Sequence, residues 1–147
     1  MNILFFLTPK SEVTYVYDDS SLSKAAQIFS ESGYTAIPLI SKSGKYLGTL
    51  TSNDVLGCIT ENFNLNMRMA SDFPIREIHR TKNSKAVNVS CDIEEIFETI
   101  INQNFVPVID DDDSFIGIIT RRSIVRWMHA GYNKSSNQDE ERNTADV

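Results

Sequence analysis

AIPLISKSGKYLGTLTSNDVL at residues 36–56 and FVPVIDDDDSFIGIITRRSIV at residues 105–125 are two copies of one pattern. They superimpose without a gap at a constant offset of 69 residues, which places Pro38 on Pro107 and Gly48 on Gly117. Four of the 21 positions are identical, and seven further pairs match one large apolar or aromatic residue with another. Two copies of one unit in a chain of 147 residues predict pseudo-twofold packing, with any binding site lying between the copies.

Both copies extend backwards into a strand and a helix. Residues 14–17 alternate like a strand, residues 18–21 supply helix-capping side chains, and apolar residues then recur at helical spacing. The second copy has the matching strand at 86–89 and a helix from Ile93, so we expect an α/β fold of two β-α-β-β-α repeats. The remaining predicted elements are strands at 37–41, 46–51, 106–110 and 115–120 and helices at 52–61 and 121–130.

We divide the chain into three parts. Residues 1–62 hold an N-terminal segment and the first repeat, and residues 63–132 hold an ordered crossover and the second repeat. Residues 133–147 are polar and show no strong periodicity, so we expect this tail to be disordered.

Composition narrows the functional class. The chain is 41% hydrophobic and 23% charged, as in ordinary soluble globular domains. Its net charge of −6 disfavours a nucleic-acid partner, which requires a basic surface. The apolar start at residues 1–7 is short and lacks a basic flank, so we interpret it as an entry helix rather than a signal peptide or membrane span. We therefore expect a cytoplasmic protein that does not associate with a membrane.

We expect neither a metal site nor a catalytic site. Cys58 and Cys91 lack metal-ligand spacing, and His79 and His129 lie outside the repeated motifs. No nucleophile–base pair can be assembled, so we predict a protein that is not an enzyme and needs no cofactor. Four aspartates at 110–113 raise the possibility of calcium, but their spacing is not that of an EF-hand loop. A solvated acidic turn is the better interpretation.

The junction between the third strand and the last helix of the first repeat is suited to an anion or a sugar. Helix N-termini present unpaired N–H groups and a positive dipole end. Thr51 could bond a phosphate there, and Asp54 could accept two neighbouring ribose hydroxyls. The same Thr-x-x-Asp spacing is also an ordinary helix-capping motif, and both interpretations stay open.

The equivalent junction of the second repeat carries Arg121 and Arg122 after Thr120, with Ser123 in place of the carboxylate. Two arginines at the positive end of a helix are electrostatically unfavourable, by about 0.3–1 kcal/mol each when exposed. They favour a docked anion, and pairing with Asp or Glu of a neighbouring element is the alternative. One junction thus suits a ribose and the other a phosphate.

The entrances of the second strands could hold an adenine. Backbone groups of residues 33–36 offer hydrogen bonds to its edge, and Tyr34 offers stacking area, with Phe105 as its counterpart. Both aromatic residues could equally belong to the core.

These patterns together resemble a known family. The duplicated unit, the proline before each turn and the G-h-h-T-x-x-D motif at 48–54 resemble a tandem CBS domain pair, or Bateman module, over roughly residues 7–130. More narrowly, GYTAIPLI at 33–40 and GIITRR at 117–122 are similar to the stand-alone cyclic di-AMP-binding CBS proteins of Firmicutes. Residues 7–13 are similar to the segment that lines the nucleotide in that group.

The resemblance implies a regulatory sensor that binds an adenine nucleotide between the repeats and signals to a partner protein. Cyclic di-AMP is the first candidate ligand, AMP or ATP is the alternative, and a dimerisation scaffold with a vestigial pocket is the alternative function. A homodimer is expected, and the regulated partner would be a (p)ppGpp synthetase or a metabolic enzyme. Since Ser123 departs from the motif, one asymmetric site per chain is preferred. The candidate nucleotide-binding residues are Val13, Thr14, Tyr34, Thr35, Ala36, Pro38, Thr51, Asp54, Phe105, Val106, Thr120, Arg121 and Arg122.

Overall fold

Each repeat folds as predicted, with the order β-α-β-β-α. The computed structural model describes residues 1–81 and 84–145. The first repeat consists of β2 (Val16–Tyr17), α1 (Leu22–Ser32), β3 (Ala36–Ile40), β4 (Tyr46–Thr51) and α2 (Ser52–Phe63). The second consists of β5 (Val87–Asn88), α4 (Ile93–Ile100), β6 (Phe105–Ile109), β7 (Phe115–Thr120) and α5 (Arg121–Ala145). Shorter elements are η1 (Ile3–Phe6), β1 (Thr8–Pro9), η2 (Lys10–Glu12), α3 (Met67–Ala70) and η3 (Ile75–Glu77).

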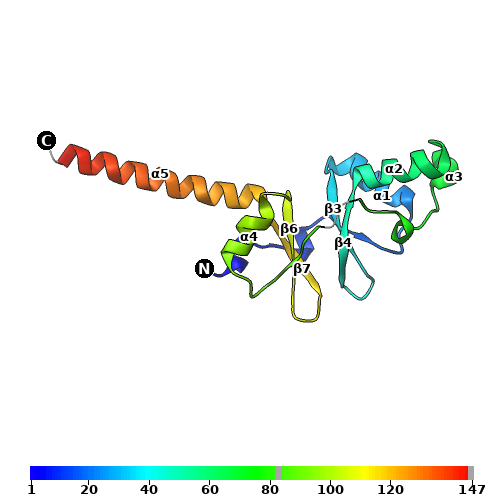
Figure 1. Cartoon of the computed structure of the whole chain (residues 1–147), viewed down its shortest axis with the longest axis horizontal. Coiled ribbons are helices and arrows are strands. Elements are labelled where there is room, and N and C mark those ends of the chain that lie inside the picture. The colour runs from blue at the N-terminus through cyan, green and yellow to red at the C-terminus, as the bar shows by residue number, and fades with distance from the viewer. Residues whose placement is uncertain (82–83, 146–147) are drawn as a thin grey trace.

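The two sheets have the same internal register. β3 lies between parallel β2 and antiparallel β4, and β6 lies in the same way between β5 and β7. Ala36 pairs with Thr51, and the equivalent Phe105 pairs with Thr120. Both hairpins shift register at the same place, between Leu39 and Ile40 in one repeat and at the equivalent pair in the other. The duplication read from the sequence is therefore a structural duplication, and the predicted α/β class is confirmed (Figure 1).

The hairpin turns of the two repeats pair with each other. The N–H of Tyr46 donates to the carbonyl of Asp113 at 3.1 Å, and the N–H of Phe115 donates to that of Gly44 at 2.9 Å. The rings of Tyr46 and Phe115 stack with centroids 6.3 Å apart. Within the acidic turn, Asp110 Oδ1 accepts two backbone N–H groups of its own turn at 2.9 Å. The four aspartates thus shape a hairpin turn that contacts the other repeat.

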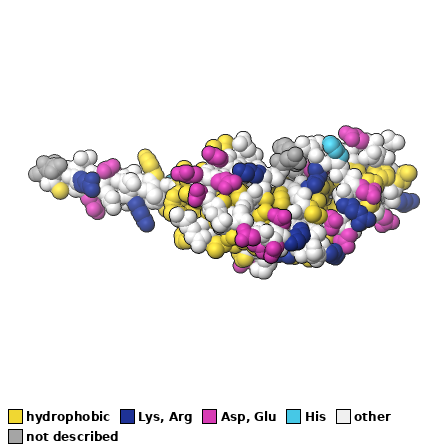
Figure 2. Space-filling view, turned by 60° about the horizontal axis from the view of Figure 1, so that its bottom comes forward, with side chains coloured by type: hydrophobic (Ala, Val, Ile, Leu, Met, Phe, Trp, Pro, Cys, Tyr) yellow, Lys and Arg dark blue, Asp and Glu magenta, His cyan; other side chains and the backbone are white. Residues whose placement is uncertain are grey.

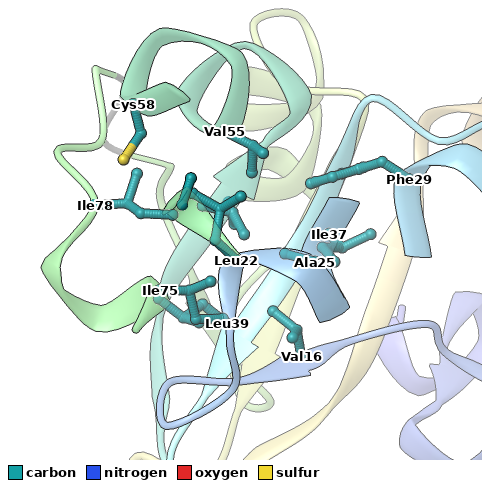
Figure 3. Packing of buried hydrophobic residues seen from close by; sticks show 12 residues of the cluster. Val16, Leu22, Ala25, Phe29, Ile37, Leu39, Val55, Cys58, Ile75 and Ile78 are labelled. Carbon is teal, nitrogen blue, oxygen red and sulfur yellow. The ribbon is translucent and has the colours of Figure 1, made fainter. Parts of the chain in front are cut away.

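Packing divides the chain differently from the sequence boundaries. Ile3 and Phe6 of the N-terminal segment are buried in the core of the second repeat, and β1 pairs with β7 of the same sheet. Ile75 and Ile78 of the crossover are buried in the core of the first repeat, and Figure 3 shows them in one cluster with α1 and β3 side chains. Each repeat therefore completes its core with a segment that we had grouped with the other one.

The tail expected to be disordered is helical in the structure. α5 continues from Arg121 to Ala145 and projects away from both sheets (Figure 1). No proline follows residue 121, the helix runs through Gly131, and the hydroxyls of Ser135, Ser136 and Thr144 donate to carbonyls of the same helix. Figure 2 shows acidic and basic side chains interspersed on the projecting part, which suits a solvated helix. None of the helices in the described ranges could cross a membrane.

Gly117 offers a test of the exchanged N-terminal segment. A Cβ at Gly117 would lie 2.2 Å from the carbonyl oxygen of Thr8, so alanine requires β1 to move off β7. We expect Gly117→Ala to lower the free energy of unfolding by about 1–3 kcal/mol, as overpacking typically does. Gly57→Ala is the matched control, because nothing lies within 4 Å of its Cβ position in α2. Urea denaturation measures both, and equal stability of the two variants would contradict the β1 placement.

Candidate functional site

Two clefts lie between the repeats, at the ends of the hairpins that are remote from the paired turns. The first, which we name the apolar cleft, has a volume of about 290 Å³. Its walls come from the N-terminal segment, the entrances of β3 and β6, and the end of β7. The lining residues are Thr8, Glu12, Val13, Thr14, Tyr34, Thr35, Ala36, Ile37, Pro38, Asn104, Phe105, Ile118 and Thr120.

The second cleft, which we name the polar cleft, has a volume of about 530 Å³. It is bounded by the end of β4, the start of α2, the crossover and the segment after α4. The lining residues are Thr35, Ala36, Thr49, Thr51, Ser52, Asn53, Thr81, Ser84, Asn102, Gln103, Asn104 and Phe105. Four residues, at 35–36 and 104–105, line both clefts and separate them.

The two clefts are images of each other under the duplication. Thr51 of the polar cleft is equivalent to Thr120 of the apolar cleft, and Gln103 is equivalent to Tyr34. Sequence reasoning missed most polar-cleft residues, including Ser84 and Gln103, because it did not carry the first-repeat positions across to the second. The offsets of 69 and 71 residues that align the repeats would have located these two residues.

Most predicted site residues lie on the clefts, and four do not. The predicted residues on the apolar cleft are Val13, Thr14, Tyr34, Thr35, Ala36, Pro38, Phe105 and Thr120. Thr51 lines the polar cleft. Val106 is fully buried in the core, so its side chain faces away from both clefts. The remaining three residues, Asp54, Arg121 and Arg122, line neither cleft.

Asp54 is buried, with an exposed fraction of 3%, and its carboxylate is occupied by the chain itself. Thr51 and Asp54 form a reciprocal capping box at 3.0 Å in both directions, in which Asp54 Oδ2 accepts the Thr51 N–H. Asp54 Oδ1 accepts both the N–H and the hydroxyl of Thr81, each at 3.1 Å. Asp54 therefore caps α2 and holds the crossover, which is the structural alternative left open by the sequence. The assignment of Asp54 to a ribose stays a prediction, and the contact with Thr81, 27 residues further along, has no local signal in the sequence.

Arg121 and Arg122 differ in their surroundings. The guanidinium of Arg121 donates to the carbonyls of Ile100 and Ile101 at 2.9 and 3.3 Å, at the C-terminal end of α4. A cation there is favoured by the helix dipole, which is a third explanation that sequence reasoning did not consider. Arg122 is exposed on α5, and within the described part of the chain no carboxylate lies within ion-pair distance of it. Arg122 is therefore the cation beside Thr120 that is available to an anion.

Tyr46 forms a hydrogen bond with a residue that lines the polar cleft. Its hydroxyl shares a hydrogen bond of 2.9 Å with the hydroxyl of Thr49, which lines that cleft. Burial raises the pKa of the Tyr46 phenol above its usual value, so the hydroxyl stays neutral at physiological pH. Thr49 therefore has a neutral hydrogen-bond partner in the Tyr46 hydroxyl at physiological pH.

The CBS domain model matches this chain twice, over residues 6–61 and 75–130. The chain belongs to the CBS domain family. The two matches coincide with the two repeats, and the clefts lie between these two CBS domains.

Several known proteins are similar to the chain. The cyclic di-AMP receptor B of Bacillus subtilis is 26% identical over 124 residues, which cover 84% of each chain. An uncharacterized protein of Methanocaldococcus jannaschii is also 26% identical over 132 residues, but the chain spans only 47% of its length. A crystal structure of CbpB in complex with cyclic di-AMP has a TM-score of 0.85 at 25% identity, and the match covers 94% of this chain and 91% of that one. Nucleotide binding is thus a property of similar CBS proteins.

The Asp54 network predicts a stability effect. Replacing Asp54 with alanine removes the capping box and leaves both Thr81 donors without their acceptor. We expect a loss of about 1–3 kcal/mol in the free energy of unfolding. Asn53→Ala, at the exposed neighbouring position, should change it by less than about 0.5 kcal/mol. Chemical denaturation of both variants decides this, and an Asp54→Ala protein as stable as Asn53→Ala would refute the network.

Proposed function

We propose that this chain is a non-catalytic regulatory sensor that binds cyclic di-AMP in the apolar cleft and signals to a partner protein. The observation that carries the proposal is the cleft itself, which gathers the residues at 13–14, 34–36 and 120 that the resemblance assigned to the nucleotide. The similarity to cyclic di-AMP receptor B and to the CbpB complex supports the choice of ligand.

The apolar cleft suits an adenine base. Tyr34 is 57% exposed, so its ring is accessible for stacking, and Phe105 and Pro38 add flat apolar surface. At the strand entrance the Tyr34 N–H donates to Ser32 Oγ and the Thr35 carbonyl accepts the Ser52 N–H, so the edge of the base is left to the other backbone groups of residues 34–36. A purine would thus be held by its faces and recognised by its edge.

The phosphates require cations, and none of the described residues that line the cleft is a lysine or an arginine. The one charged side chain among them is that of Glu12, which disfavours an anion directly beside it. We assign the phosphate to Arg122, with the Thr120 hydroxyl and the first turn of α5 alongside. Arg121 would join only by leaving the α4 carbonyls, so its first role in the proposal is to hold α4 against the site.

We also propose a homodimer. Leu56 on α2 and Val125 on α5 occupy equivalent positions and are 56% and 54% exposed, so the two repeats present apolar residues on corresponding helices. Exposed apolar surface of this kind favours association with a second chain. The regulated partner in this proposal is a (p)ppGpp synthetase or a metabolic enzyme, and the setting is the cytoplasm.

Thermal unfolding with cyclic di-AMP, AMP, ATP and S-adenosylmethionine in parallel tests the ligand. A ligand at 100 times its dissociation constant stabilises a protein by about 2.7 kcal/mol, or roughly 5–10 °C for a chain of this size. We expect such a shift with cyclic di-AMP and little with the others. A shift with AMP or ATP alone would make the protein an energy sensor, and no shift with any nucleotide would favour a dimerisation scaffold.

Arg122→Ala tests the phosphate assignment. Losing one or two hydrogen bonds to a charged group, at about 1.5–3 kcal/mol each, should weaken cyclic di-AMP binding by about tenfold or more. Arg126→Ala is the matched control, because Arg126 is also exposed on α5, one turn further from Thr120. Isothermal titration calorimetry measures both affinities. Equal affinities in the two variants would remove Arg122 from the site.

A further inference from the structure

The Asp54 carboxylate beside the polar cleft is bonded in the way that a sugar would bond it. A ribose offers neighbouring hydroxyl donors to a carboxylate, and Thr81 offers Asp54 Oδ1 a hydroxyl and an N–H at 3.1 Å each. A carboxylate oxygen has two lone pairs, so these two bonds fill Oδ1. Oδ2 already accepts the Thr51 N–H in the capping box and is buried with the rest of the side chain. Asp54 therefore has no accessible oxygen left for a ligand.

We propose that Thr81 is an internal substitute for a ligand hydroxyl at Asp54, and that it keeps ribose-bearing nucleotides out of the polar cleft. The proposal deepens the proposed function, on which it rests for the statement that the apolar cleft is the nucleotide site. Thr81 is thereby a specificity-determining residue. The Thr-x-x-Asp motif at 51–54 is intact in the sequence, but in the structure Thr81 occupies the carboxylate that a ribose would bind.

The lining of the polar cleft differs in chemistry from that of the apolar cleft. Three positions that are apolar or aromatic in the apolar cleft have polar equivalents here: Val13 corresponds to Ser84, Tyr34 to Gln103, and Ile118 to Thr49. Among the residues that the structure describes, the lining includes no charged side chain. With Asp54 occupied by Thr81, a ribose finds no free carboxylate among the described residues of this cleft.

Thr81 is held in place by its neighbour. Arg80 donates from Nη1 to the carbonyl of Leu47 at 3.2 Å, and its guanidinium lies across Gly48. It approaches so closely that a Cβ at Gly48 would be 1.6 Å from Nη1. A ligand that displaced Thr81 would therefore also have to disturb the Arg80 contact, which adds to the cost of entry.

Three substitutions of Thr81 separate the effect of its hydrogen bond on AMP binding from the effect of its volume. Thr81→Ala removes the hydroxyl and opens the space that it fills. Thr81→Ser keeps the hydroxyl and is the matched control, whereas Thr81→Val loses the hydrogen bond but keeps the volume. AMP and cyclic di-AMP are titrated calorimetrically into the full-length wild type and each variant, and circular dichroism melting checks that each is folded.

We expect Thr81→Ala to bind AMP in the polar cleft more tightly than the wild type and the Ser and Val variants do. AMP affinity at that site should be about tenfold or more above the Thr81→Ser value, as one hydrogen bond to a charged group allows. Adding Asp54→Asn to Thr81→Ala should abolish the gain. Equal AMP binding by the Ala and Ser variants would overturn the proposal.

Wild-type stoichiometry gives a second, independent test that does not depend on how well a variant folds. Two nucleotides per wild-type chain, with the second lost in Asp54→Asn, would also overturn the role of Thr81. Cyclic di-AMP binding to the wild type and its weakening in Arg122→Ala report on the proposed function alone. A failure of that function is thus distinguished from a failure of the Thr81 proposal, which is decided by AMP.

Discussion

A pair of backbone hydrogen bonds between the hairpin turns fixes how the two repeats face each other. One runs from Tyr46 to Asp113 and the other from Phe115 to Gly44, and each is the image of the other under the 69-residue offset. Two such bonds, with the stacked rings of Tyr46 and Phe115 beside them, leave little freedom to rotate one repeat against the other. Because the clefts lie at the opposite ends of these same hairpins, the pairing of the turns sets the width of both clefts.

The exchange of segments between the repeats builds the outer walls of the clefts. The N-terminal segment, which completes the core of the second repeat, brings Thr8 to the apolar cleft. The crossover, which completes the core of the first repeat through Ile75 and Ile78, brings Thr81 and Ser84 to the polar cleft. Burial of each core thus positions one wall of a binding surface, so folding and site formation depend on the same apolar contacts.

The sequence predicted those features that have a local signal. The bounds of β4 and β7 and the cap of α1 at Ser21 agree with the structure, because alternation and capping chemistry are encoded within a few residues. The pairing of β1 with β7 has no such signal, and the low hydropathy of residues 133–145 is as typical of a solvated helix as of disorder. In the site, Thr-x-x-Asp is compatible with a capping box and with a ligand, and the contact from Thr81 to Asp54 could not be predicted because Thr81 is remote in sequence.

The shared residues at 35–36 and 104–105 link what happens in one cleft to the other. A base entering the apolar cleft contacts Phe105, which also lines the polar cleft, so a movement of that ring changes both surfaces. The polar cleft is bounded in turn by Thr81, whose bonds to Asp54 tie the crossover to the start of α2. Under the proposed function, a ligand in the apolar cleft would act on the polar cleft through the residues that line both. Its effect on the surface is limited by its differential affinity for the two states of the protein that it would shift.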